Sequence, residues 1–178
     1  MKKPQFEFIK TPIDDVFVIE KSKFEDDRGT FIKTYSKEAF DLVGLSSDFK
    51  ESYFSFSKKN VLRGMHFQRH PFGHAKLITV IEGEILDVCV CIGGVLNKRN
   101  TGKFFSIILS KDNNKSLYIP EGYAHGFLCL SETAIVMSHM TTVFNPQNDD
   151  GIHYLSFGFK WPIDNPIISS KDKTLKPF

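Results

Sequence analysis

The stretch at residues 76–92, KLITVIEGEILDVCVCI, decides the fold class. It contains two short runs rich in β-branched side chains, at 76–81 and 84–92, separated by Glu82-Gly83. Runs of this composition favour strands, and a Gly-containing break between them is typical of a turn. The stretch therefore predicts two consecutive strands.

The same pattern continues outward from this stretch in both directions. Asn113-Asn114 and Glu121-Gly122 mark further turns between short apolar runs. The spacing is close and regular, as in a sandwich, barrel or jelly roll. The remaining strand candidates are residues 16–20, 50–57, 103–109, 116–119, 126–130 and 134–139.

Helical signals are sparse. Ser36 is placed to cap a short helix, Glu38 favours its N-terminal end, and Gly44 ends it. The segment 161–178, rich in Pro, Ser and Lys, is expected to wrap the surface. No repeat, low-complexity tract or linker interrupts the chain. Residues 1–178 are therefore predicted to form a single all-β domain with one or two short helices.

The overall composition excludes several classes of protein. The 178 residues are 41% apolar and 25% charged, as expected of one globular domain. A net charge of +2 without a Lys/Arg block gives no support for nucleic-acid binding. No apolar run approaches membrane-spanning length. Three cysteines, Cys89, Cys91 and Cys129, cannot form a secreted disulfide framework, so they are predicted to be reduced core residues of a cytoplasmic protein.

One motif, Arg63-Gly64-Met65-His66-Phe67-Gln68, carries chemistry. Arg63 and His66 are an odd number of positions apart, so a regular strand would direct them to opposite faces. A bulge or bend at Gly64 would direct both into one cavity. A guanidinium suits phosphate, and an imidazole suits proton transfer. The motif therefore indicates chemistry on a phosphorylated small molecule.

A metal site is the alternative interpretation of the histidines. A small β-barrel can hold a metal with several histidines and one carboxylate. His66, His70 and His74 are each four residues apart, a spacing that suits a helix, whereas Pro71 and Gly73 indicate a loop there. The candidate ligands are His66, His70, His74, His125 and Glu82.

Several segments, in order from about residue 16 to residue 172, carry a family resemblance. The most specific are Arg63-Gly64-Met65-His66-Phe67-Gln68 and Pro120-Glu121-Gly122-Tyr123-Ala124-His125-Gly126-Phe127, joined by Asp27-Arg28-Gly29-Thr30-Phe31, Trp161-Pro162 and Ser170-Lys171-Asp172. Together they resemble the dTDP-4-dehydrorhamnose 3,5-epimerase family. The resemblance implies a cupin-type jelly roll, a homodimer, no metal or other cofactor, and a nucleotide-diphosphate sugar as substrate. It also implies a place in deoxysugar and surface-polysaccharide biosynthesis.

The resemblance assigns roles to individual residues. His66 is the base that removes a proton next to the C4 ketone, and Asp172 orients its imidazole. Lys76 stabilises the enolate oxygen, and Arg63 holds the diphosphate. Other residues expected to bind the substrate are Gln68 and His125 in the same cavity, Glu51, Lys171, Phe31 and Phe144 for stacking on the base, and Arg28 and Lys33. The segment around Arg28 and Phe31 is expected to reach the site of the neighbouring subunit.

The chain departs from the family pattern at the residue that would return the proton and at residues that would recognise the nucleotide. The family's tyrosine, thought to act as the acid opposite the histidine, falls on Ser138 here, and a hydroxyl of serine is a much weaker acid than a phenol. Glu51 and Tyr53 stand where glutamine and asparagine are expected, and Lys33 replaces a glutamate that helps to read the base. Single or double epimerisation is therefore left open. dTDP is the favoured carrier, with CDP and GDP as alternatives.

Two other functions remain open from the sequence. One is a 3,4-ketoisomerase, which would use the same enolate but move the carbonyl. The other is a catalytically silent protein that binds a sugar nucleotide in the same pocket.

Overall fold

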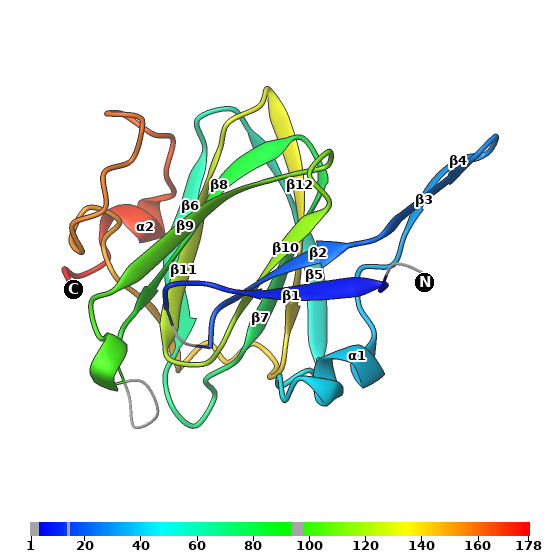
Figure 1. Ribbon diagram of the computed structural model, residues 1–178. Coiled ribbons are helices and arrows are strands. Elements are labelled where there is room, and N and C mark those ends of the chain that lie inside the picture. Colours follow the sequence, from blue (N-terminus) through cyan, green and yellow to red (C-terminus); the bar gives the residue numbers. More distant parts are fainter. Residues whose placement is uncertain (1–3, 14, 94–97) are drawn as a thin grey trace.

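Two antiparallel sheets lie face to face in the computed structural model, which describes residues 4–13, 15–93 and 98–178 (Figure 1). In spatial order, the larger sheet contains β1 (Phe6–Lys10), β2 (Phe17–Lys21), β10 (Lys115–Ile119), β7 (Lys76–Glu82), β12 (Thr133–Met140) and β5 (Glu51–Lys58). The smaller sheet contains β13 (Asp149–Gly151), β6 (Leu62–Gln68), β11 (Tyr123–Cys129), β8 (Glu84–Cys91) and β9 (Phe104–Ser110). This arrangement confirms the predicted all-β jelly roll.

The remaining elements lie outside the sandwich. A two-stranded ribbon, β3 (Lys23–Asp26) and β4 (Gly29–Ile32), extends away from its body (Figure 1). Two short helices, α1 (Lys37–Leu42) and α2 (Ser170–Lys173), and the 3₁₀ turn η1 (Lys98–Asn100) complete the described elements. No helix in the described part of the chain is long and apolar enough to cross a membrane.

The core between the sheets follows from the two-residue period of the strands. On β12, Ala134, Val136, Ser138 and Met140 are buried, whereas the residues between them are partly exposed. Ala134 and Val136 pack with side chains from the facing sheet, including Ile85, in one apolar cluster. Ser138 interrupts this apolar series, so the inward face of β12 becomes polar toward one end.

Part of the outer face of each sheet is also covered. Residues 152–168 pack against the outside of the smaller sheet, with Trp161 buried there. The indole of Trp161 donates a 3.0 Å hydrogen bond to the carbonyl of Tyr154. On the larger sheet, Phe40 of α1 is fully buried in an aromatic cluster with Tyr118.

Several boundaries differ from those predicted. The strand expected at 126–130 begins at Tyr123, because its first residues pair with β8. Ser36 occupies the N-cap position of α1, but its side chain makes no capping hydrogen bond. The second of the one or two predicted short helices, α2, lies in the C-terminal segment. The prediction that Cys89, Cys91 and Cys129 are reduced and buried is confirmed.

Candidate active site

Two adjoining cavities, of about 440 and 350 Å³, open between the sheets where β5, β7 and β12 face β6. They share four lining residues, Tyr53, His66, Lys76 and Lys171, and we call them together the active-site cleft. Their combined size is in the range of small-molecule sites. The chemistry available in this cleft depends on how each element positions its side chains.

An irregularity in β6 directs Arg63 and His66 into the cleft together. His125 of β11 pairs with His66, but Phe127, two residues on, pairs with Arg63, three residues back. One extra residue of β6 is accommodated between these pairs, at Gly64-Met65, and Gly64 has a φ of +131°. Because the extra residue changes the parity of the strand, both side chains reach the same side. The predicted bulge is confirmed.

His66 is hydrogen-bonded to Asp172, 106 residues further along the chain. The imidazole Nε2 lies 2.7 Å from Oδ1 of the carboxylate. The His66 side chain is 33% exposed and can reach a substrate, whereas that of Asp172 is only 4% exposed. With Nε2 donating to Asp172, Nδ1 is the nitrogen that can accept a proton. The sequence-based pairing of these two residues is thus present in the structure.

Helix α2 places the Asp172 carboxylate. Ser169 caps the helix by accepting a 3.0 Å hydrogen bond from the backbone N–H of Asp172. The other carboxylate oxygen accepts from the backbone N–H of Gly64 at 3.3 Å. Burial opposes ionisation of Asp172, but the hydrogen bonds from His66, Gly64 and Ser169 outweigh it and lower the pKa of the carboxyl. Asp172 is therefore a carboxylate at neutral pH.

Lys76 supplies a buried cation to the same cleft. It is 7% exposed, and its Nζ donates a 3.0 Å hydrogen bond to the backbone carbonyl of His66. Burial lowers the pKa of the ammonium to about 8, with partial opposition from the carboxylates of Asp87 and Asp149. A poorly solvated ammonium interacts strongly with a developing negative charge.

A second His–carboxylate pair lies deeper in the cleft. Nε2 of His125 is 2.5 Å from Oδ1 of Asp87, which is fully buried on β8. Burial lowers the pKa of His125, although the Asp87 carboxylate acts in the opposite direction. The expected cavity position of His125 is present, but its partner was not anticipated. The available signal was an acidic residue at an inward position of an otherwise apolar strand.

Some predicted binding residues lie together at the second cavity. Glu51, Phe144 and Lys171 line it, and Oε2 of Glu51 accepts a 2.7 Å hydrogen bond from the backbone N–H of Phe144. Lys171 forms an ion pair with Asp149 there. Ser138 and Arg63 line the first cavity, and Arg63 Nε donates to the hydroxyl of Ser57 at 3.0 Å.

Gln68 lies in the active-site cleft with His66 and Lys76, as expected. Its side chain lies at the second cavity and is 7% exposed. The amide NH₂ donates to the carbonyls of Phe72 and Val143, and the amide oxygen accepts from the backbone N–H of Asn145. Gln68 therefore ties two loops together at the rim, because these backbone groups use most of its hydrogen-bonding capacity.

Three predicted binding residues lie away from the cleft of their own chain. Arg28 forms an ion pair with Asp26 at the tip of the ribbon, and Phe31 is 63% exposed beside Phe24. Lys33 follows the ribbon and lines neither cavity of the cleft. The structure of one chain does not bring these three residues to His66.

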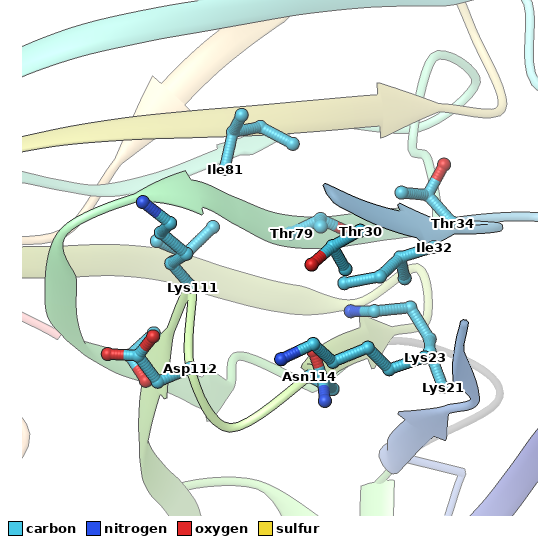
Figure 2. Close-up of a pocket in the computed structure, with 12 residues that line it drawn as sticks. Lys21, Lys23, Thr30, Ile32, Thr34, Thr79, Ile81, Lys111, Asp112 and Asn114 are labelled. Carbon is cyan, nitrogen blue, oxygen red and sulfur yellow. The ribbon is translucent and has the colours of Figure 1, made fainter. Parts of the chain in front are cut away.

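The histidines do not converge on a metal site. Among the described residues, no group of three or more His, Cys, Asp or Glu side chains could hold a metal ion. Glu82, the carboxylate considered for that site, forms a surface ion pair with Lys111. A separate cavity of about 280 Å³, lined by Lys21, Lys23 and residues of the ribbon and β7, contains none of the predicted site residues (Figure 2).

The sequence model of one family, dTDP-4-dehydrorhamnose 3,5-epimerase, matches residues 10–178. The chain belongs to this family. It is therefore an epimerase, in the isomerase class, and the predicted relationship is confirmed.

Individual members of the family are similar over nearly the whole chain. The dTDP-4-dehydrorhamnose 3,5-epimerase of Methanothermobacter thermautotrophicus is 41% identical, over 97% of this chain and 95% of its own length. The crystal structure of the Bacillus anthracis epimerase with TDP and pyrophosphate bound has a TM-score of 0.92 at 32% identity, covering 97% of this chain and 99% of that one. The Legionella pneumophila epimerase, in complex with dTDP-4-keto-L-rhamnose, has a TM-score of 0.90 at 34% identity, covering 97% and 92%.

Proposed function

We propose that this protein inverts C3, C5 or both in a nucleotide-linked 4-dehydro-6-deoxy sugar, with dTDP as the carrier. The observation that carries the proposal is the His66–Asp172 pair beside the buried ammonium of Lys76. A C–H bond next to a ketone becomes acidic enough for an imidazole only if the enolate oxygen is stabilised. The cleft contains a base and a cation for these two tasks.

The first step is removal of a proton by His66. Nδ1 accepts the proton from carbon, and the Asp172 carboxylate stabilises the imidazolium that forms. The electron pair moves to the C4 oxygen, which Lys76 stabilises as a point charge. Arg63 lines the same cavity and is placed to bind the diphosphate. Return of a proton to the opposite face completes an inversion.

In this proposal, a second copy of the chain contributes residues to the nucleotide-binding site. Phe54 and Phe56 point outward from the edge strand β5 and are 68% and 55% exposed. Aromatic side chains that are exposed at a sheet edge in a single chain usually mark a surface that a partner covers. We therefore propose a homodimer in which the ribbon residues Arg28 and Phe31 complete the partner's site.

The protein is proposed to act in the cytoplasm, as a single-domain unit of residues 1–178.

Isotope exchange tests the proposal. The protein is incubated with a dTDP-linked 4-keto-6-deoxy sugar in deuterated water, and the carbons that gain deuterium are located by NMR. Deuterium at C3 and C5 supports double epimerisation, and deuterium at one carbon supports mono-epimerisation. The CDP- and GDP-linked sugars are run in parallel to identify the carrier.

The same experiment separates the alternatives. A carbonyl that moves to C3 would indicate a ketoisomerase, and no exchange with any carrier would contradict the proposed function. His66→Ala is expected to reduce exchange by about 10²-fold or more, while dTDP binding remains near that of the wild type. Exchange at the wild-type rate in this variant would rule out His66 as the base.

A further inference from the structure

Inversion at a carbon requires a proton donor on the face opposite the base. His66 stands on the smaller sheet, so the donor must come from the wall formed by the larger sheet. Ser138 lies on that wall, but an aliphatic hydroxyl is a poor acid. Lys171, another group at the junction of the cavities, comes from the C-terminal segment and is ion-paired with Asp149.

The larger sheet brings one phenol into the cleft. Tyr53 is on β5, and it lines both cavities together with His66 and Lys76. Along β5, Glu51, Tyr53 and Ser55 point toward the cleft, as the two-residue period requires. β5 and β6 belong to opposite sheets of the sandwich (Figure 1). Because Tyr53 and His66 line the same two cavities between these sheets, they approach the cleft from opposite walls.

Strand pairing joins Tyr53 to Ser138. The two residues are directly opposite each other in the antiparallel pair of β5 and β12. Side chains at such positions are close enough to touch, and the interaction of the Ser138 hydroxyl with the Tyr53 phenol acts to lower the pKa of that phenol. The short side chain at position 138 thus leaves room beside it for the tyrosine of the neighbouring strand.

The surroundings keep this phenol protonated. Desolvation raises the pKa of Tyr53, and the negative charges of Glu51 and Asp149 act in the same direction. The hydrogen bond from Ser138 and the charge of Arg63 oppose this shift only in part. The other titratable groups that share a cavity with Tyr53 are His66, His74, Lys76, His125, Lys171 and Asp172.

We propose that Tyr53 is the general acid of the epimerisation, positioned by Ser138, and that it protonates the enolate carbon on the face opposite His66. In this step the phenol O–H bond breaks and a C–H bond forms, while the C4 carbonyl is restored. The phenolate then takes a proton from water, and the His66 imidazolium releases its proton to water. The inference rests on the proposed function and adds a residue to it.

Tyr53→Phe separates the two halves of the reaction. Without the phenol, His66 can still remove a proton, exchange it with deuterated water and return it to the same face. We therefore expect deuterium incorporation with retention to continue, while inversion falls by about 10²-fold or more. Tyr35→Phe is the matched control, because it also removes a phenol hydrogen bond, to the carbonyl of Ser47, but lies outside the cleft.

A swap variant tests whether the phenol or the strand position matters. Tyr53→Asn combined with Ser138→Tyr is expected to recover at least about one tenth of the inversion lost in Tyr53→Asn. Inversion at the wild-type rate in Tyr53→Phe would overturn the inference while leaving the proposed function intact. If the wild type itself shows no exchange, the proposed function fails, so the two failures are distinguishable.

A third measurement does not depend on removing the side chain. Incorporation of 3-fluorotyrosine at position 53 keeps the ring and hydroxyl but makes the phenol more acidic. The ratio of inversion to exchange isolates the contribution of the phenol, because both processes need the same base and the same enolate. That ratio should fall at a lower pH in the fluorinated protein. An unchanged pH dependence would contradict donation by Tyr53.

Discussion

Lys76 and Lys21 form a natural comparison at the scale of single residues. Both are buried in the larger sheet, and burial lowers the pKa of each ammonium to about 8. Lys76 lines the active-site cleft, whereas Lys21 donates to Ser116 on the other side of the sheet. Both groups cost folding free energy when charged, but only Lys76 is placed to stabilise an enolate.

Lys76→Met is therefore expected to gain stability and lose activity. A shift from 10.5 to about 8 corresponds to an upper limit of about 3 kcal/mol at pH 7. Because the folded-state pKa is depressed, the unfolded chain binds more protons between pH 8 and pH 10.5. Wild-type stability should rise through that window, and the advantage of the variant should shrink. Urea unfolding at pH 7 and pH 10 measures this change.

Lys21→Met provides the control for that experiment. It should show the same pH-dependent gain in stability, since its burial and its pKa shift are similar. Its deuterium exchange should stay at the wild-type rate, whereas that of Lys76→Met should fall. Equal exchange in the two variants would show that Lys76 takes no part in stabilising the enolate.

At the scale of elements, the irregular strand β6 determines whether the base and the phosphate-binding group share one cleft. Gly64 has a φ of +131°, and a Cβ there would lie 2.5 Å from Cα of Gly126 and 3.0 Å from the carbonyl oxygen of His125. Neither contact can relax by rotating a side chain. Gly64→Ala would therefore have to displace β6 from β11.

Gly64→Ala is expected to lower the free energy of unfolding by at least about 2 kcal/mol and to reduce exchange. Gly158→Ala is the control, because Gly158 also has a positive φ, of +82°, but a Cβ there meets nothing within 4 Å. It should cost about 1–2 kcal/mol of backbone strain and leave exchange unchanged. Thermal unfolding and deuterium exchange distinguish the two variants. Equal losses of stability and of exchange in the two variants would mean that the close packing of Gly64 against Gly126 has no functional role.

The elements also show why the sequence predicted some features and not others. The runs that became β7 and β8 carry a strong β-branched signal, and the parity of Arg63 and His66 was sufficient to predict a bulge. The pairing of Tyr53 with Ser138 depends on the register of β5 against β12. Register arises from packing across the whole sheet, so the sequence showed a missing acid at position 138 but not the phenol beside it.

The same limit applies to residues joined by long-range folding. Asp172 was paired with His66 through a family resemblance, since no local pattern relates positions 106 residues apart. Asp87 was missed because an inward carboxylate in an apolar strand has no meaning until its partner, His125, is located. The hydrogen bonds of Gln68 to two loops were not anticipated, because strand direction alone does not reveal which loop carbonyls compete for its amide.

At the scale of the whole molecule, the ribbon is the part that a single chain leaves unexplained. β3 and β4 project from the sandwich (Figure 1). Phe24 and Phe31, which lie on these strands, are exposed. Such a ribbon gains little stability alone, since a two-stranded hairpin is only marginally stable in water. In the proposed homodimer it would pack on the partner and carry Arg28 and Phe31 to the partner's cleft.

Mixing two inactive variants tests this arrangement. One chain carries His66→Ala, and the other carries Arg28→Ala with Phe31→Ala. If the ribbon acts on the partner's cleft, each mixed dimer has one site with both an intact base and an intact ribbon. Refolding the chains together in equal amounts should then restore about one quarter of the wild-type exchange, since half of the dimers are mixed and each has one working site. If the ribbon acts within its own chain, no mixed dimer contains an intact site and the mixture should stay inactive.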